Sequence, residues 1–67
     1  MKAREIVENG IYLNHDAVSE RTVTSIHGEG KDKEVYYLDH SNWKHGLTTV
    51  SKMAEWATER VDVKRKK

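Results

Sequence analysis

The stretch TVSKMAEWATERV, residues 49–61, combines a helical repeat with a helix start signal and decides the fold expected for this chain. At about 100° per residue, its apolar side chains fall on one arc and most of its charged side chains fall opposite. The apolar set is Val50, Met53, Ala54, Trp56, Ala57 and Val61. The hydroxyl of Thr49 or Ser51 is available as an N-cap. The pattern predicts one C-terminal amphipathic helix whose apolar face packs against the rest of the chain.

The residues before this helix are rich in β-branched and aromatic side chains, which favour strands. Residues 21–26 (RTVTSI) and 34–39 (EVYYLD) predict two strands that are joined by a charged loop with two glycines. Residues 40–46 are typical of a loop, and residues 47–50 predict a short strand that runs into the helix. The fold class expected is α+β, with a small antiparallel sheet of roughly three to five short strands followed by the helix.

The N-terminal residues 3–14 leave two interpretations open. Asn9 and Gly10 lie between two apolar segments, and an Asn-Gly pair readily forms the type I′ turn of a β-hairpin. A short helix over residues 2–8, ended by Gly10, is the alternative. The β-branched Ile6 and Val7 weaken the helix and make the hairpin the favoured interpretation.

Length and composition bound the class of protein. A chain of 67 residues forms one domain with a small core, which argues against a deep catalytic cleft. There is no cysteine, so the sequence offers neither disulfides nor thiolate metal ligands. The sequence contains no long apolar run and no signal-peptide pattern, so we expect a soluble cytoplasmic protein that does not bind membranes. Residues 1–62 are expected to form the domain, and residues 63–67 a flexible basic tail.

The net charge of +1 is unevenly distributed along the chain. Lys64, Arg65, Lys66 and Lys67 carry four positive charges, which leaves eight basic and eleven acidic side chains, a net charge of −3, in residues 1–63. Domains that bind duplex nucleic acid normally display a basic face, and this body has no such excess. The tail is interpreted as a solvated segment, with phosphate contact as the alternative.

No pattern of catalytic or metal-binding residues is present. Four histidines fall in or beside predicted loops without the i,i+4 spacing of a helical metal site. Asp39, His40 and His45 come nearest to a zinc site, but solvated loop histidines explain them better. The three serines lack the context of an activated nucleophile, and residues 28–30 (GEG) are typical of a turn. We therefore expect no enzyme, no cofactor, no metal and no small-molecule substrate.

The succession of RTVTSI, a glycine loop, EVYYLD and a last strand entering a helix resembles small SH3-like or KOW-like barrels over roughly residues 10–61. The segment SKMAEWA after VYYLD is similar, more loosely, to the ends of short uncharacterised phage and prophage proteins. The resemblance implies a partly open SH3-like barrel. It implies no functional residue, because the chain lacks the basic loops of KOW modules and the clustered aromatic groove of SH3 domains.

The aromatic side chains are the best candidates for function. Trp56 is expected in the core, whereas Trp43 lies in a polar loop and is the best candidate for an exposed aromatic residue. Trp43, Tyr36 and Tyr37 are the predicted partner-binding residues. The expected function is a non-enzymatic interaction or regulatory module, phage- or prophage-encoded, that binds a protein partner or itself through this aromatic patch. Two alternatives stay open: Trp43 caps the open end of the sheet, or strand aromatics and Lys64–Lys67 bind nucleic acid.

Overall fold

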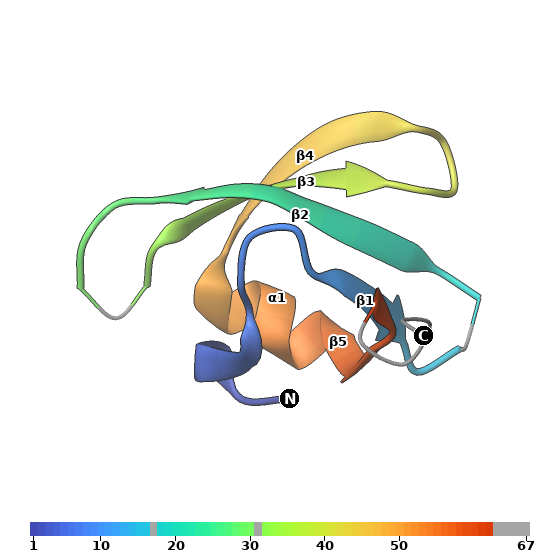
Figure 1. Cartoon of the computed structure of the whole chain (residues 1–67), viewed down its shortest axis with the longest axis horizontal. Coiled ribbons are helices and arrows are strands. Elements are labelled where there is room, and N and C mark those ends of the chain that lie inside the picture. Colours follow the sequence, from blue (N-terminus) through green and yellow to red (C-terminus); the bar gives the residue numbers. More distant parts are fainter. Residues whose placement is uncertain (17, 31, 63–67) are drawn as a thin grey trace.

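The computed structural model describes residues 1–16, 18–30 and 32–62, in which five short antiparallel strands accompany one α-helix (Figure 1). In chain order the elements are a 3-10 turn η1 (Ala3–Glu5), β1 (Ile11–Asn14), β2 (Glu20–His27), β3 (Glu34–Asp39), β4 (Lys44–Thr49), α1 (Val50–Trp56) and β5 (Ala57–Arg60). The strand order across the sheet is β4-β3-β2-β1-β5, and the described strands do not close into a barrel. The prediction of a small antiparallel sheet with one helix is therefore confirmed.

The core lies between the inner face of the sheet and α1, which runs beneath the strands with η1 beside it (Figure 1). Tyr12 of β1 is the largest fully buried side chain. Its hydroxyl donates to the carbonyl oxygen of Glu5 at 2.7 Å and accepts from the backbone N–H of Val7 at 2.9 Å. These two hydrogen bonds hold the N-terminal segment against β1, and burial raises the pKa of the Tyr12 hydroxyl.

Strand β2 bends at a bulge. Val23 pairs with Tyr37 and Ser25 pairs with Tyr36, so Thr24 is an extra residue without a partner of its own on β3. The bulge shifts the alternation of β2, and as a result both Val23 and Ile26 turn toward the core. The predicted strands at residues 21–26 and 34–39 are confirmed as β2 and β3. The strict alternation expected for residues 21–26 is wrong, because it places Val23 and Ile26 on opposite faces of the sheet.

The predicted C-terminal helix is wrong in its second half. The helix ends at Trp56, and Ala57–Arg60 form β5, which pairs with β1 at the edge of the sheet opposite β4. Asn14, a buried polar side chain of β1, donates from Nδ2 to the carbonyl oxygen of Trp56 at 2.7 Å. This bond satisfies a carbonyl at the end of the helix, and β1 supplies backbone partners for the residues that follow.

The start of the helix agrees with the sequence. Thr49 is the N-cap, and its Oγ1 accepts from the N–H of Lys52 at 3.3 Å. A second acceptor comes from the β2–β3 loop, where Asp32 Oδ1 accepts from the N–H of Ser51 at 3.0 Å. The strand before the helix is longer than expected, because β4 begins at Lys44, and the predicted loop at residues 40–46 therefore ends at residue 43.

The favoured hairpin at residues 3–14 is wrong in its first strand. The second strand forms, as β1, but residues 3–8 contain one 3-10 turn at Ala3–Glu5 and no strand, and the alternative helix over residues 2–8 is not formed beyond that turn. Asn9 takes a positive φ of 69°, but its N–H donates to the carbonyl oxygen of Val23 on β2 at 2.7 Å. The segment therefore joins β2 and places Ile6 in the core, where it is 5% exposed.

Met53 and not Trp56 is the central core residue of the helix. Met53 is fully buried, whereas Trp56 is only partly buried and packs against the edge of the core. No helix in the described part of the chain is long and apolar enough to cross a membrane. The basic tail, Lys64–Lys67, lies outside the described residues.

Candidate interaction surface

The outer face of β3 and β4 exposes large apolar side chains. Cross-strand partners share a face of a sheet, and Tyr36 pairs with Leu47 while Leu38 pairs with His45. Tyr36 is 39% exposed and Leu47 is 56% exposed. The ring of His27 meets the Tyr36 ring edge-on, with centroids 5.5 Å apart. We call Tyr36, Leu38, Trp43 and Leu47 the outer patch.

Trp43 extends this patch at the turn between β3 and β4. Its side chain is 66% exposed, and its ring stacks on the ring of His40 with centroids 5.0 Å apart and an interplanar angle of 20°. His40 Nε2 lies 2.7 Å from Thr22 Oγ1, and Thr22 pairs with Leu38. Trp43 is thus connected to the outer face through His40.

The backbone of Trp43 is in the left-handed region, with φ 56°. This conformation is uncommon for a residue other than glycine or asparagine, and a bulky side chain there costs roughly 1–2 kcal/mol. The turn holds the residue in place, because the N–H of Trp43 donates to the carbonyl oxygen of Asp39 at 2.7 Å. An exposed tryptophan therefore occupies a strained position that a glycine would occupy without strain.

Tyr37, the third predicted partner-binding residue, lies on the opposite face of β3. Its ring lies against Gly46, where a Cβ would collide with it. The guanidinium of Arg21 lies 4.4 Å from the centroid of the Tyr37 ring and 4.2 Å from that of Trp56. The structure therefore brings Tyr36 and Trp43 together on one face, and uses Tyr37 in a cation–π sandwich that joins β2, β3 and the end of α1.

Two features of the surface were missed by the sequence interpretation. The sequence predicts Leu47 at the start of a strand that begins three residues later than β4 does. That Leu47 lies beside Tyr36 on the outer face depends on the pairing of β4 with β3. Arg21 is the second missed residue, because nothing in its neighbouring sequence indicates which side chains it contacts. In the structure its Nε is buried without a hydrogen bond and lies 3.9 Å from Asp39 Oδ2. Only the register of β2 against β3 brings Arg21 to Tyr37 and Asp39.

The residues that came nearest to a metal site have other partners. Asp39 accepts from Ser41, and His40 contacts Thr22 and Trp43. Across residues 1–16, 18–30 and 32–62, no three histidine, cysteine or acidic side chains converge in a way that would hold a metal ion.

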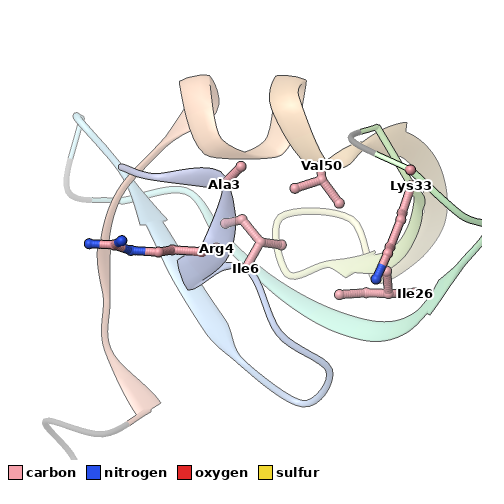
Figure 2. Close-up of a pocket in the computed structure, with 7 residues that line it drawn as sticks. Ala3, Arg4, Ile6, Ile26, Lys33 and Val50 are labelled. Carbon is pink, nitrogen blue, oxygen red and sulfur yellow. The ribbon is translucent and has the colours of Figure 1, made fainter.

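A pocket of about 280 Å³ lies on the other side of the molecule, between η1, the β2–β3 loop and the start of α1 (Figure 2). Its lining residues are Ala3, Arg4, Ile6, Ile26, Gly30, Lys33 and Val50. In Figure 2 the guanidinium of Arg4 points away from the pocket, whereas the amine of Lys33 lies near Ile26. Among the described residues the lining is mainly apolar, with the amine of Lys33 beside it.

Acid is expected to loosen the turn that carries Trp43. The Ser41 hydroxyl and then its backbone N–H donate to Asp39, at 2.7 and 2.9 Å, and these bonds lower the pKa of that carboxyl below its ordinary value of 3.8. A carboxyl whose pKa is lowered by folding stabilises the protein above its unfolded pKa, and this contribution is lost as the pH falls through the folded value. The pKa values of Asp16, Asp32 and Asp62 are lowered as well.

We therefore expect the melting temperature to be nearly constant from neutral pH to about pH 5 and to fall on further acidification. Calorimetric scans between pH 7 and pH 2 measure this dependence. Asp39→Asn should be less stable at neutral pH and should lose less stability on acidification. A variant with the same acid dependence as the parent protein would show that the Ser41–Asp39 bonds do not contribute.

Comparisons with known proteins add no assignment: no family model matches the chain, and neither does any curated protein or solved structure.

Proposed function

We propose that this protein is a small, non-enzymatic interaction module that binds a protein partner through the outer patch. The single observation that carries the proposal is Trp43, which is 66% exposed and has a positive φ. A large apolar ring at a strained, solvent-facing position costs stability and adds nothing to the core. Exposed tryptophans are frequent energetic anchors of protein interfaces, and Tyr36 and Leu47 supply further apolar surface on the same face.

The SH3-like arrangement is part of this proposal. It is supported by the strand order β4-β3-β2-β1-β5, by the bulge that bends β2, and by a short helix inserted between the last two strands. In this arrangement the inner face is filled by the core, and binding uses strand faces and loops. The outer patch is a surface of that kind.

Trp43→Gly is expected to keep the fold and to lose the interaction. Relief of the positive φ, about 1–2 kcal/mol, offsets the lost stacking on His40 and the greater chain entropy of glycine, about 0.5–1 kcal/mol each. We expect a free energy of unfolding within about 1 kcal/mol of the parent value, measured by urea denaturation. Partner affinity should fall by about 2 kcal/mol, roughly 30-fold in Kd.

Val18→Gly is the matched control, because Val18 is an exposed apolar residue, at 80%, outside the outer patch. Both variants and the parent protein are immobilised and used to capture proteins from cell extract, and retained proteins are quantified by mass spectrometry. The proposal requires at least one protein that the parent and Val18→Gly retain and Trp43→Gly does not. If the parent protein and both variants retain the same proteins, Trp43 is not an interaction residue. If Trp43→Gly unfolds, the expected compensation between relief of the positive φ and lost stacking is wrong.

The alternative, single-stranded nucleic acid, is favoured by one observation: Trp43 and Tyr36 present exposed rings on which bases can stack. Fluorescence titration with single- and double-stranded oligonucleotides at two salt concentrations separates it from the first proposal. Deleting residues 64–67 would remove most of the favourable charge and should abolish such binding, with little effect on a protein partner.

A further inference from the structure

Strand β4 is an edge strand of the sheet formed by the described residues. Within the described residues it pairs only with β3, from Glu34↔Thr49 to Asp39↔Lys44. In Figure 1 it lies at the outer side of the sheet, beside β3 and away from β1, and its end leads into α1. An edge of this kind is a ready template for pairing with another strand.

The register shows which backbone groups point outward. The N–H of Val50 donates to the carbonyl oxygen of Lys33 at 3.0 Å, which continues the β3–β4 register by one residue. In an antiparallel ladder, alternate residues bond to the same neighbour, so Gly46 and Thr48 also face β3. His45 and Leu47 must therefore direct their N–H and C=O groups away from the sheet, and Thr49 directs its N–H the same way. The carbonyl oxygen of Thr49, the N-cap, accepts the first hydrogen bond of α1.

The two edges of the sheet differ in how they are protected. Strand β5 is four residues long, has a register shift at Thr58 and carries the charged Glu59 and Arg60. These are common devices against edge-to-edge pairing. Strand β4 has six residues, no register shift and no proline, and Lys44 at its end is its only charged residue apart from a titratable histidine. At its centre it presents Leu47, which is 56% exposed.

We infer that β4 pairs in antiparallel fashion with β4 of a second copy of this chain, about a twofold axis at Leu47. His45 of one copy then lies opposite Thr49 of the second copy, and Leu47 lies opposite Leu47. The two Leu47 residues exchange two backbone hydrogen bonds, and the N–H of each Thr49 donates to the carbonyl oxygen of His45 in the other copy. The two five-stranded sheets then join into one.

The side chains of β4 are compatible with this twofold arrangement. The two Leu47 side chains become cross-strand neighbours on the outer face, next to Tyr36 of each copy. The two Lys44 residues lie at opposite ends of the paired strands, so no like charges meet. This inference names a second copy of the chain as a partner. It rests on the proposed function in one respect, the use of Leu47 as a contact residue.

Sedimentation equilibrium tests the pairing directly. Pairing of residues 45–49 of each copy makes a small interface, so we expect an association that depends on concentration and not a permanent dimer. The average mass of the parent protein should rise from 7.8 kDa toward twice that value between about 10 µM and 1 mM. Leu47→Lys places two ammonium groups at the axis and should remain at the monomer mass. Val18→Lys, an equal charge change at an exposed valine, should associate like the parent protein.

A cysteine variant gives an independent measurement. Because the chain contains no cysteine, any disulfide in Leu47→Cys joins two copies. Opposed residues of a hydrogen-bonded antiparallel pair have Cα atoms about 5.5 Å apart, within the range that a disulfide spans. Oxidised glutathione, which is reduced to two thiols as the disulfide forms, should link Leu47→Cys several-fold faster than Val18→Cys, although Val18 is the more exposed position.

Two results would overturn the inference. One is a parent protein that stays monomeric up to 1 mM. The other is a Leu47→Lys variant that still associates, together with a Leu47→Cys variant that forms disulfide-linked dimers no faster than Val18→Cys. Either result leaves the proposed function standing if Trp43→Gly still loses a captured protein. Conversely, a dimer formed through β4 together with unchanged capture by Trp43→Gly would contradict the proposed function alone.

Discussion

Tyr12→Ala is expected to leave the protein largely unfolded at 37 °C. The side chain is fully buried at the centre of the core, and removing a buried aromatic ring costs about 3–5 kcal/mol. The substitution also removes the hydrogen-bond partner of the Glu5 carbonyl and the Val7 N–H. A domain of this size has a free energy of unfolding of only about 5 kcal/mol, so the loss takes most of it.

Tyr12→Phe separates the ring from the hydroxyl. It keeps the packing and removes the two hydrogen bonds, which should cost about 1–3 kcal/mol. Urea denaturation followed by far-UV circular dichroism measures both variants, and Tyr36→Ala, on the outer face, serves as the control with a smaller effect. A Tyr12→Phe variant as stable as the parent would show that the bonds to residues 5 and 7 do not hold the N-terminal segment.

Met53→Ala should have the second largest effect, a loss of about 2–5 kcal/mol in the free energy of unfolding. Met53 is fully buried between α1 and the sheet, and its removal leaves a cavity that its neighbours fill only in part. Lys52→Ala is the matched control on the same helix, because Lys52 is exposed and alanine preserves the helix. Equal stabilities of the two variants, measured by thermal unfolding, would mean that α1 does not dock through Met53.

The sequence predicted the elements that local pattern alone determines. Strand β3 and most of β2 follow from β-branched and aromatic residues between turn residues, and the start of α1 follows from Thr49. In each case the residues that decide the structure are neighbours in sequence.

The end of the helix could not be predicted in the same way. Ala57 and Val61 fit the helical repeat of residues 49–61, and both are buried in the structure, although neither belongs to α1. They are buried because β5 pairs with β1, whose residues lie more than 40 positions earlier. A single sequence contains no local signal of that pairing, and tertiary contacts override helix propensity here.

The candidate site was predicted in part for a similar reason. Exposure of Trp43 followed from its polar neighbours, and the structure agrees. That Tyr36 shares a face with Leu47, whereas Tyr37 faces Arg21, depends on the registers of three strands and on the bulge at Thr24. Neither the registers nor the bulge can be read from alternation alone.

The position of β1 between β2 and β5 has a consequence for the order in which the protein folds. Its pairing with β2 closes a short loop, but its pairing with β5 joins segments about 45 residues apart, as in the bond from Thr58 to Leu13. During synthesis the β1–β4 meander leaves the ribosome first, and one side of β1 has no neighbour until the residues after the helix arrive. Closing so long a loop is slow compared with forming a hairpin. Among the described strands β5 therefore joins the sheet last, and we expect its docking to be a late step of folding.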